Sequence, residues 1–186
     1  MVLVELMEIA GVMIGIHTAQ AVGHREPTIL GGRRCRHPSR GIVDDVHATP
    51  GSRSMLVPIM WGLIFGVIQA ASPLAARWLD HATVLALELV LIAAVYIGFA
   101  VADGRPRVIA VESVVAGLFV VLAATAITAT AWLLVLGYTG HGLKDAWQQR
   151  RQYVANTRWW PPFCAAVDWL VAAVLIIAIT AGVQFH

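Results

Sequence analysis

Four long apolar stretches constrain the fold of this chain more than any other feature of the sequence. They cover about residues 55–71, 83–102, 108–136 and 163–183. A helix rises about 1.5 Å per residue and the hydrocarbon core of a bilayer is roughly 30 Å thick, so about 20 apolar residues cross it. Two stretches have that length, the first is slightly short, and the third is longer than one crossing needs. The sequence predicts an all-α integral membrane protein built as a four-helix bundle.

The composition supports this class. The chain is 59% hydrophobic and only 13% charged, whereas soluble domains carry about 25% charged residues. A net charge of +2 is too small to indicate a nucleic-acid partner, so the expected partner is the lipid bilayer. Lys144 is the only lysine among the basic residues, and this arginine bias with frequent Ala, Val and Gly is typical of GC-rich bacterial genomes.

The segment 1–54 differs from the rest of the chain. Between Thr18 and Ser54 it is rich in Gly, Pro, Arg, Ser and His and shows no apolar periodicity. Such a segment cannot bury enough apolar surface to offset the entropy lost on ordering. We therefore expect residues 1–54 to be disordered and residues 55–186 to form the membrane domain. Because Met55 opens the first apolar stretch directly, we also expect the native chain to start there.

The connection 137–162, between the third and fourth apolar stretches, carries an amphipathic pattern. From Leu143 to Val154 the apolar residues lie on one side of a helix and the polar residues on the other. This pattern predicts a short helix lying in the membrane interface, with Trp147, Trp159 and Trp160 as interfacial anchors.

Gly62 and Gly66 form a G-x-x-x-G pair in the first apolar stretch. Two glycines at this spacing let a second helix approach closely, so they predict a helix-packing contact.

Four crossings would place the connections 72–82 and 137–162 on the same membrane side. Glu88 and Asp168 would then both lie roughly 7–10 Å deep on that side. A carboxylate in hydrocarbon costs about 2.5–3.5 kcal/mol even on lenient scales, and such groups usually face the bundle interior. We expect a polar cluster at this face, forming a ligand or ion pathway from Glu88, Asp168, His141, Asp145, Lys144 and Arg158.

The pathway is a hypothesis, and the favoured interpretation of this cluster is a set of ion pairs. Asp168 would pair with Arg158 or Lys144, and Glu88 with His81 or Arg77. Glu112 is expected on the opposite side of the membrane, near Arg105 and Arg107.

A metal site is weakly signalled. His141 and Asp145 are four residues apart and share one helix face, and with Asp168 or Glu88 they could form a carboxylate–imidazole site. A second histidine is wanted, and His81 is the only candidate. We therefore predict no metal and no cofactor, and favour a plain hydrogen bond for His141.

Three functions fit these observations. The favoured one is a non-catalytic membrane protein with a structural or complex-subunit role, as a homo-oligomer or within a larger complex. The second is an oligomeric transporter of protons, cations or small solutes that uses Glu88 and Asp168. The third is a membrane enzyme with an interfacial site of His141, Asp145 and Asp168, which the absence of nucleotide-binding, hydrolase and metalloprotease motifs makes the least favoured.

The distribution of basic residues predicts the orientation. The connections 72–82 and 137–162 hold more Lys and Arg than the connection between the second and third stretches or the C-terminal tail. The positive-inside rule then places both connections in the cytoplasm and the protein in the cell (plasma or inner) membrane.

Overall fold

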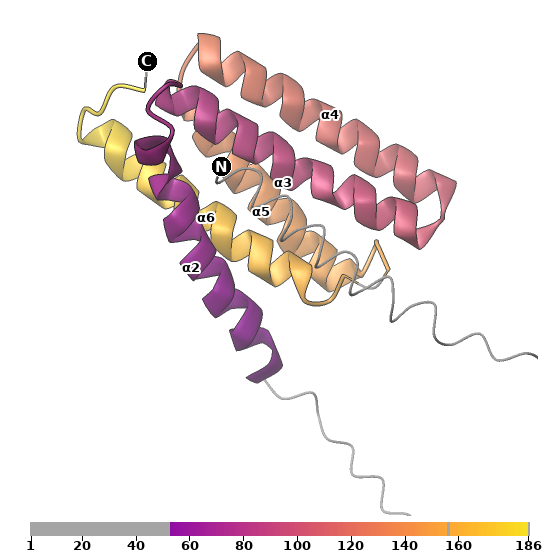
Figure 1. Cartoon of the computed structure of the whole chain (residues 1–186). Helices are drawn as coiled ribbons and strands as arrows, with labels where there is room; N and C mark the ends of the chain where they lie inside the picture. Colours follow the sequence, from indigo (N-terminus) through magenta and orange to yellow (C-terminus); the bar gives the residue numbers. More distant parts are fainter. Residues whose placement is uncertain (1–52, 156, 186) are drawn as a thin grey trace, which may run out of the picture. The chain divides into compact units, whose positions relative to one another are not determined.

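The computed structural model describes residues 53–155 and 157–185, and within these ranges it contains five helices and no strand. The predicted all-α class is confirmed. In chain order the helices are α2 (Arg53–Ala75), α3 (His81–Asp103), α4 (Pro106–Thr128), α5 (Trp132–Arg151) and α6 (Trp160–Thr180) (Figure 1). Two predictions concern the start of the chain: disorder in residues 1–54 and a native start at Met55. Residues 1–52 lie outside the described residues.

Four of the described helices are long and apolar enough to cross a membrane. They are Met55–Ala75, His81–Asp103, Pro106–Thr128 and Trp160–Thr180. Their number and composition are compatible with a membrane protein.

The third apolar stretch contains a helix boundary that the sequence analysis missed. Residues 108–136 were expected to form one long span, but α4 ends at Thr128 and α5 begins at Trp132. The hydroxyl groups of Thr125 and Thr128 both bond to carbonyls of their own helix, an arrangement that competes with regular helix bonding and is tolerated best near helix ends. The excess length of this stretch is therefore the start of another helix.

Helix α5 runs through the bundle and is not the short interfacial helix expected over Leu143–Val154. It has 20 residues and is therefore about 30 Å long. A Cβ atom added to Gly137 would lie 2.5 Å from Leu89 of α3, and one added to Gly142 would lie 2.4 Å from Trp169 of α6. The glycines thus permit close approach of α5 to its neighbours. The prediction of an interfacial helix is not confirmed.

The polar face of α5 points inward. His141, Asp145 and Gln148 are fully buried, while four large apolar side chains on the same helix are about half exposed: Trp132, Leu136, Leu143 and Trp147. This is the reverse of the pattern in a water-soluble bundle, where the apolar face is inside. Because its polar residues lower its mean hydropathy, α5 is not among the four apolar candidates.

The two ends of the bundle are marked by contacts between connections. At one end, the Arg105 guanidinium donates to the Tyr153 carbonyl at 2.6 Å and the Ala155 amide donates to Asp103 at 2.7 Å. The Arg105 guanidinium also donates a hydrogen bond to the Asp103 carboxylate, and this bond raises the pKa of exposed Arg105. At the other end, where α3 starts, the Ala82 amide donates to the Phe185 carbonyl at 3.3 Å.

These contacts correct the expected topology. The connection after α5 lies beside the C-terminal end of α3, whereas the connection 76–80 leads into the N-terminal end of the same helix (Figure 1). The 23 residues of α3 separate these two connections by about 34 Å. They therefore lie at opposite ends of the bundle, because α5 adds a helix along the bundle that hydropathy did not reveal.

Helix α2 packs on α6 through the glycine pair. A Cβ atom at Gly62 would lie 2.3 Å from the Phe163 carbonyl oxygen, and one at Gly66 would lie 3.3 Å from the Leu170 side chain. The pairing order, Gly62 with Phe163 and Gly66 with Leu170, shows that the two helices run parallel.

Candidate functional site

A series of buried and half-buried polar side chains lies inside the bundle, and we call it the polar row. It consists of side chains from all five described helices: Gln69, Ser72, Glu88, Tyr96, Glu112, Tyr138, His141, Lys144, Asp145, Gln148 and Asp168. Its members are described below in order from the N-terminal end of α3 to its C-terminal end.

Glu88 begins the polar row. Its Oε1 atom accepts a hydrogen bond of 2.5 Å from the Ser72 hydroxyl of α2, and its Oε2 atom has no partner in the described structure. The carboxyl group is buried. Its contact is therefore with a neutral hydroxyl, and the expected pairing with His81 or Arg77 is not what the described side chains form.

Tyr138 continues the polar row from α5. It is fully buried, its hydroxyl accepts a hydrogen bond from Gln69 Nε2 at 3.2 Å, and it donates one to the Leu85 carbonyl at 2.8 Å. Leu85 is three residues before Glu88 on α3, and Tyr138 is three residues before His141 on α5. Tyr138 thus lies between Glu88 and His141.

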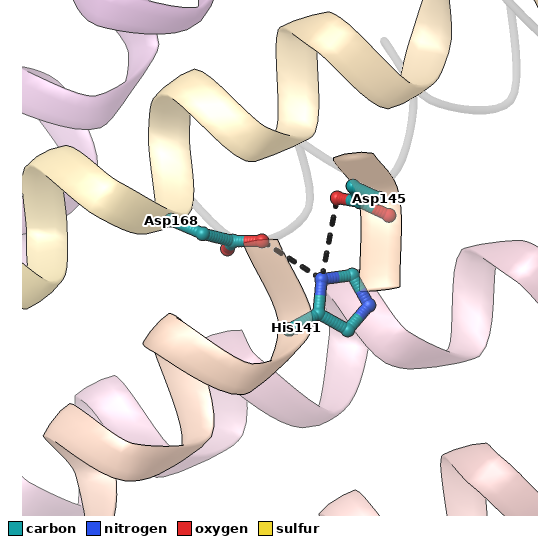
Figure 2. A group of neighbouring side chains, drawn as sticks. All are labelled: His141, Asp145 and Asp168. Atoms are coloured by element: carbon teal, nitrogen blue, oxygen red, sulfur yellow. Dashed lines mark hydrogen bonds and ion pairs between the residues drawn. The ribbon is translucent and has the colours of Figure 1, made fainter. Parts of the chain in front are cut away.

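His141, Asp145 and Asp168 form the centre of the polar row, and we call them the triad. The His141 Nδ1 atom lies 2.8 Å from Asp168 Oδ2 and 3.4 Å from Asp145 Oδ2. All three side chains have no exposed surface. Both carboxylates point toward one nitrogen of the imidazole ring, from α5 on one side and α6 on the other (Figure 2).

Two aromatic rings pack against the imidazole of the triad. The ring of Phe119 meets the His141 ring edge-on at a centroid distance of 5.0 Å, and the ring of Tyr96 lies at 5.9 Å. These contacts restrict the rotation of the imidazole, so Nδ1 is held toward the carboxylates.

Lys144 and Glu112 form an ion pair next to the triad. The Lys144 Nζ atom lies 2.8 Å from Glu112 Oε2, and it also sits 3.4 Å from the centroid of the Tyr96 ring. The side chains are 14% and 2% exposed, respectively. The sequence analysis placed these two residues on opposite membrane sides. The structure brings them together because α4 and α5 are antiparallel neighbours.

Many polar atoms of the polar row have no hydrogen-bond partner among the described residues. Besides Lys144 Nζ and Glu112 Oε2, which face each other in the ion pair, they are Glu88 Oε2, the Tyr96 hydroxyl, His141 Nε2, both oxygens of Asp145, both amide atoms of Gln148 and Asp168 Oδ1. Buried polar groups in proteins are nearly always satisfied, and an unsatisfied one calls for an explanation such as water or an ion. The interior of this bundle therefore has the hydrogen-bonding capacity to hold further polar groups.

The structure gathers four of the six expected site residues, namely His141, Asp145, Asp168 and Lys144. Glu88 is about 10 Å from the start of α3 and Asp168 about 12 Å from the start of α6, but these helix ends lie at opposite ends of the bundle. Arg158 is exposed in the connection before α6. The cluster therefore lies in the bundle interior and is not gathered at one end of the bundle.

Sequence reasoning missed the role of three polar residues, Tyr96, Tyr138 and Gln148. His141, Asp145 and Gln148 recur at intervals of four and three residues, which is the spacing of one helix face. That signal was present in the sequence. Gln148 was nevertheless assigned to the water-facing side, because Leu143–Val154 was expected to form an interfacial helix.

The three tryptophans expected as anchors occupy the same end of the bundle. Trp147 is half exposed on the last turns of α5, and Trp159 and Trp160 are partly buried at the start of α6. The Trp159 ring stacks on the Phe163 ring at 5.1 Å. Their role as interfacial anchors stays a prediction.

A pocket near the N-terminal end of α3 is separate from the polar row. It has a volume of about 190 Å³ and is lined mainly by apolar side chains of α2, α3, α6 and the C-terminal tail, among them Pro73, Leu85, Val174 and Phe185. None of the carboxylates of the polar row lines this pocket. The polar row is therefore not part of this pocket.

The comparisons with known proteins gave no match: no family model, no curated protein and no solved structure matches the chain. The apolar helices make the chain compatible with a polytopic membrane protein. Any more specific function rests on the chemistry of the polar row.

Proposed function

We propose that this protein is a five-pass membrane protein that moves protons or small cations along the polar row. The observation that carries the proposal is a row of polar groups inside the bundle, which includes the Ser72–Glu88 hydrogen bond, the Gln69–Tyr138 hydrogen bond, the triad and the Lys144–Glu112 ion pair. Ionisable residues inside membrane helices are costly and mark ion pathways or proton relays in many membrane proteins.

The charge balance of the polar row favours cations. It contains four buried carboxylates, Glu88, Glu112, Asp145 and Asp168, but only one lysine and one histidine. Lys144 neutralises Glu112, and a protonated His141 would neutralise one further acid. Because burial of an unpaired charge is unfavourable, the remaining carboxylates favour uptake of protons or metal cations.

The dense packing of the polar row favours a small transported species. The Tyr138 hydroxyl has two hydrogen bonds, and the aromatic rings of Phe119 and Tyr96 pack against the His141 ring. A bulky solute would have to displace these rings, whereas a proton moves by exchange between neighbouring groups.

A liposome assay tests the proposal. Purified protein is reconstituted with a pH-sensitive dye inside, and flux is started by a potassium diffusion potential. We expect Glu88→Gln and Asp168→Asn each to reduce the flux at least tenfold, because each removes a carboxylate that accepts the cation. The matched control is Arg150→Gln, which changes an exposed charge on α5. Flux equal to that of empty liposomes, or flux unchanged in both acid variants, would exclude the transport function.

A subunit role is the second candidate, and the exposure of α2 supports it. Only 17% of the most apolar 18-residue stretch of this helix is buried in the described structure, and this is the smallest share among the four apolar helices. The face of α2 opposite the glycine pair offers Met60, Ile64, Val67 and Ile68 to lipid or to another helix. Native mass spectrometry from detergent tests this role: a homo-oligomer or a co-purifying membrane protein supports it, and a lone monomer contradicts it.

A further inference from the structure

We propose that the triad His141, Asp145 and Asp168 binds one divalent transition-metal ion. The inference rests on the proposed function, since it names the cation that the centre of the polar row receives. It goes beyond that function because a metal ion requires a defined set of ligand atoms, whereas protons require only neighbouring acids and bases.

The distances in the triad suit a shared metal ion. One ligand atom from each of the three residues lies within 4.8 Å of the other two. The imidazole nitrogen is 2.8 Å from one carboxylate oxygen and 3.4 Å from the other. Metal–ligand bonds of about 2.0–2.2 Å hold neighbouring ligands roughly 3–3.5 Å apart in tetrahedral or octahedral geometry. Only small shifts are needed to place all three atoms around one ion.

The charges in the triad call for a divalent ion. Two carboxylates and a neutral imidazole carry a charge of −2, which one M²⁺ ion balances. The neighbouring cation Lys144 is already engaged, because its Nζ atom lies 2.8 Å from Glu112. Two fully buried aspartates thus share one imidazole between them.

The unsatisfied oxygens provide independent support. Asp145 is fully buried, its carboxylate points at the imidazole, and neither oxygen has a hydrogen-bond partner in the described structure (Figure 2). The Oδ1 atom of Asp168 also has none. The imidazole has a single Nδ1 proton, and in this geometry it is shared with Asp168 Oδ2, so these three oxygens are left without a donor. A metal ion accepts electron pairs from several oxygens at once and fits the arrangement better.

The ligand types point to the class of metal. Imidazole favours Zn, Fe, Ni and Cu, while carboxylates are also good ligands for Mn. Calcium and magnesium prefer oxygen ligands throughout. The mixed set of one imidazole and two carboxylates therefore favours Zn²⁺, Fe²⁺ or Mn²⁺, with water completing the coordination.

Cobalt binding to the purified full-length protein tests this inference directly. Protein stripped with a chelator is titrated in detergent with Co²⁺, whose visible absorption bands report coordination by protein ligands. We expect saturation at one Co²⁺ per chain and displacement by one equivalent of Zn²⁺. Asp145→Asn and Asp168→Asn should each weaken Co²⁺ binding at least 100-fold. The control is Arg150→Gln, which changes an exposed charge on α5 outside the polar row and should bind Co²⁺ like the natural chain.

A second measurement covers the case in which a triad variant does not fold. Zn²⁺ should raise the thermal unfolding temperature of the natural chain and of Arg150→Gln by the same amount, because both have the complete triad. Absence of stoichiometric Co²⁺ binding by the natural chain would overturn the metal site, as would equal binding in both aspartate variants. In that case the triad is an ion-paired imidazolium.

The two proposals fail separately. Proton flux in liposomes without any Co²⁺ binding would overturn the metal site and support the proposed function. Co²⁺ binding without flux of protons or metal ions would overturn the transport function and leave the metal site in place.

Discussion

Replacing Lys144 with methionine tests whether α5 lies inside the bundle. Methionine has nearly the length of lysine but no charge, so the substitution preserves packing and removes the cation that lies 2.8 Å from Glu112. Glu112 is 2% exposed, so water cannot replace the lost partner. The buried carboxylate must then stay charged without compensation or become protonated.

The magnitude follows from these two options. Removing one partner of a buried ion pair typically costs about 3–5 kcal/mol. A glutamic acid in water has a pKa of about 4.3, so neutralising one costs about 3.7 kcal/mol at pH 7 and about 1 kcal/mol at pH 5. Protonation sets the upper bound, so we expect Lys144→Met to lower the free energy of unfolding by about 3–4 kcal/mol at pH 7. At pH 5 the loss relative to the natural chain should shrink to about 1 kcal/mol.

An interfacial position of α5 predicts a smaller loss of unfolding free energy. If α5 were a helix in the membrane interface, Lys144 would be solvated, and losing an exposed ion pair costs about 1 kcal/mol or less at either pH. The size of the effect therefore distinguishes a bundle helix from an interfacial one.

The measurement is unfolding in mixed detergent and dodecyl sulfate micelles, followed by far-ultraviolet circular dichroism at pH 7 and pH 5. The double variant Glu112→Gln with Lys144→Met should regain most of the loss, because it leaves no uncompensated charge. Arg150→Met changes an exposed charge on the same helix and should stay within about 0.5 kcal/mol of the natural chain. A loss below 1 kcal/mol at pH 7, or a loss that does not depend on pH, would refute the buried pair.

Three further predictions follow from the fold. In sealed membrane vesicles, a membrane-impermeant maleimide should label Arg77→Cys and Arg158→Cys from opposite sides, and labelling of both from one side would contradict five passes. Gly62→Leu should destabilise the protein by about 1–3 kcal/mol in the same unfolding assay through overpacking against α6, whereas Gly98→Leu, at a position where an added Cβ meets nothing within 4 Å, should be neutral; equal effects would argue against the parallel contact. Tyr138→Phe removes two hydrogen bonds and should cost about 1–3 kcal/mol, so an unchanged unfolding midpoint would show that the hydroxyl is not buried between α2 and α3.

Much of the fold was predictable from local features. Runs of apolar residues long enough to cross a bilayer located α2, α3 and α6. Gly104 and Pro106, which both interrupt helices, separated α3 from α4. Errors arose where hydropathy and structure diverge. The break at residues 129–131 lies among small and threonine residues with no glycine, proline or charge, so the apolar run continued across it without interruption.

The candidate site was predictable as a set of residues but not as an arrangement. Burial cost alone singles out Glu88 and Asp168, because a carboxylate in an apolar helix needs a partner. The partners were wrongly assigned: Asp168 meets His141 and Glu112 meets Lys144. Each of these pairings depends on whether α5 lies inside the bundle. A linear pattern of polar residues does not say whether the polar face of a helix points to water or to the interior.

Composition and periodicity alone determined that this chain is helical and suited to lipid, because the apolar length needed to cross a bilayer is a property of each segment by itself. Only the tertiary structure decided the number of helices in the bundle and the partners of the charged groups. A helix with one polar face fits two environments, the membrane surface or the inside of a bundle. The choice between them depends on the complementary acids and glycines of the neighbouring helices.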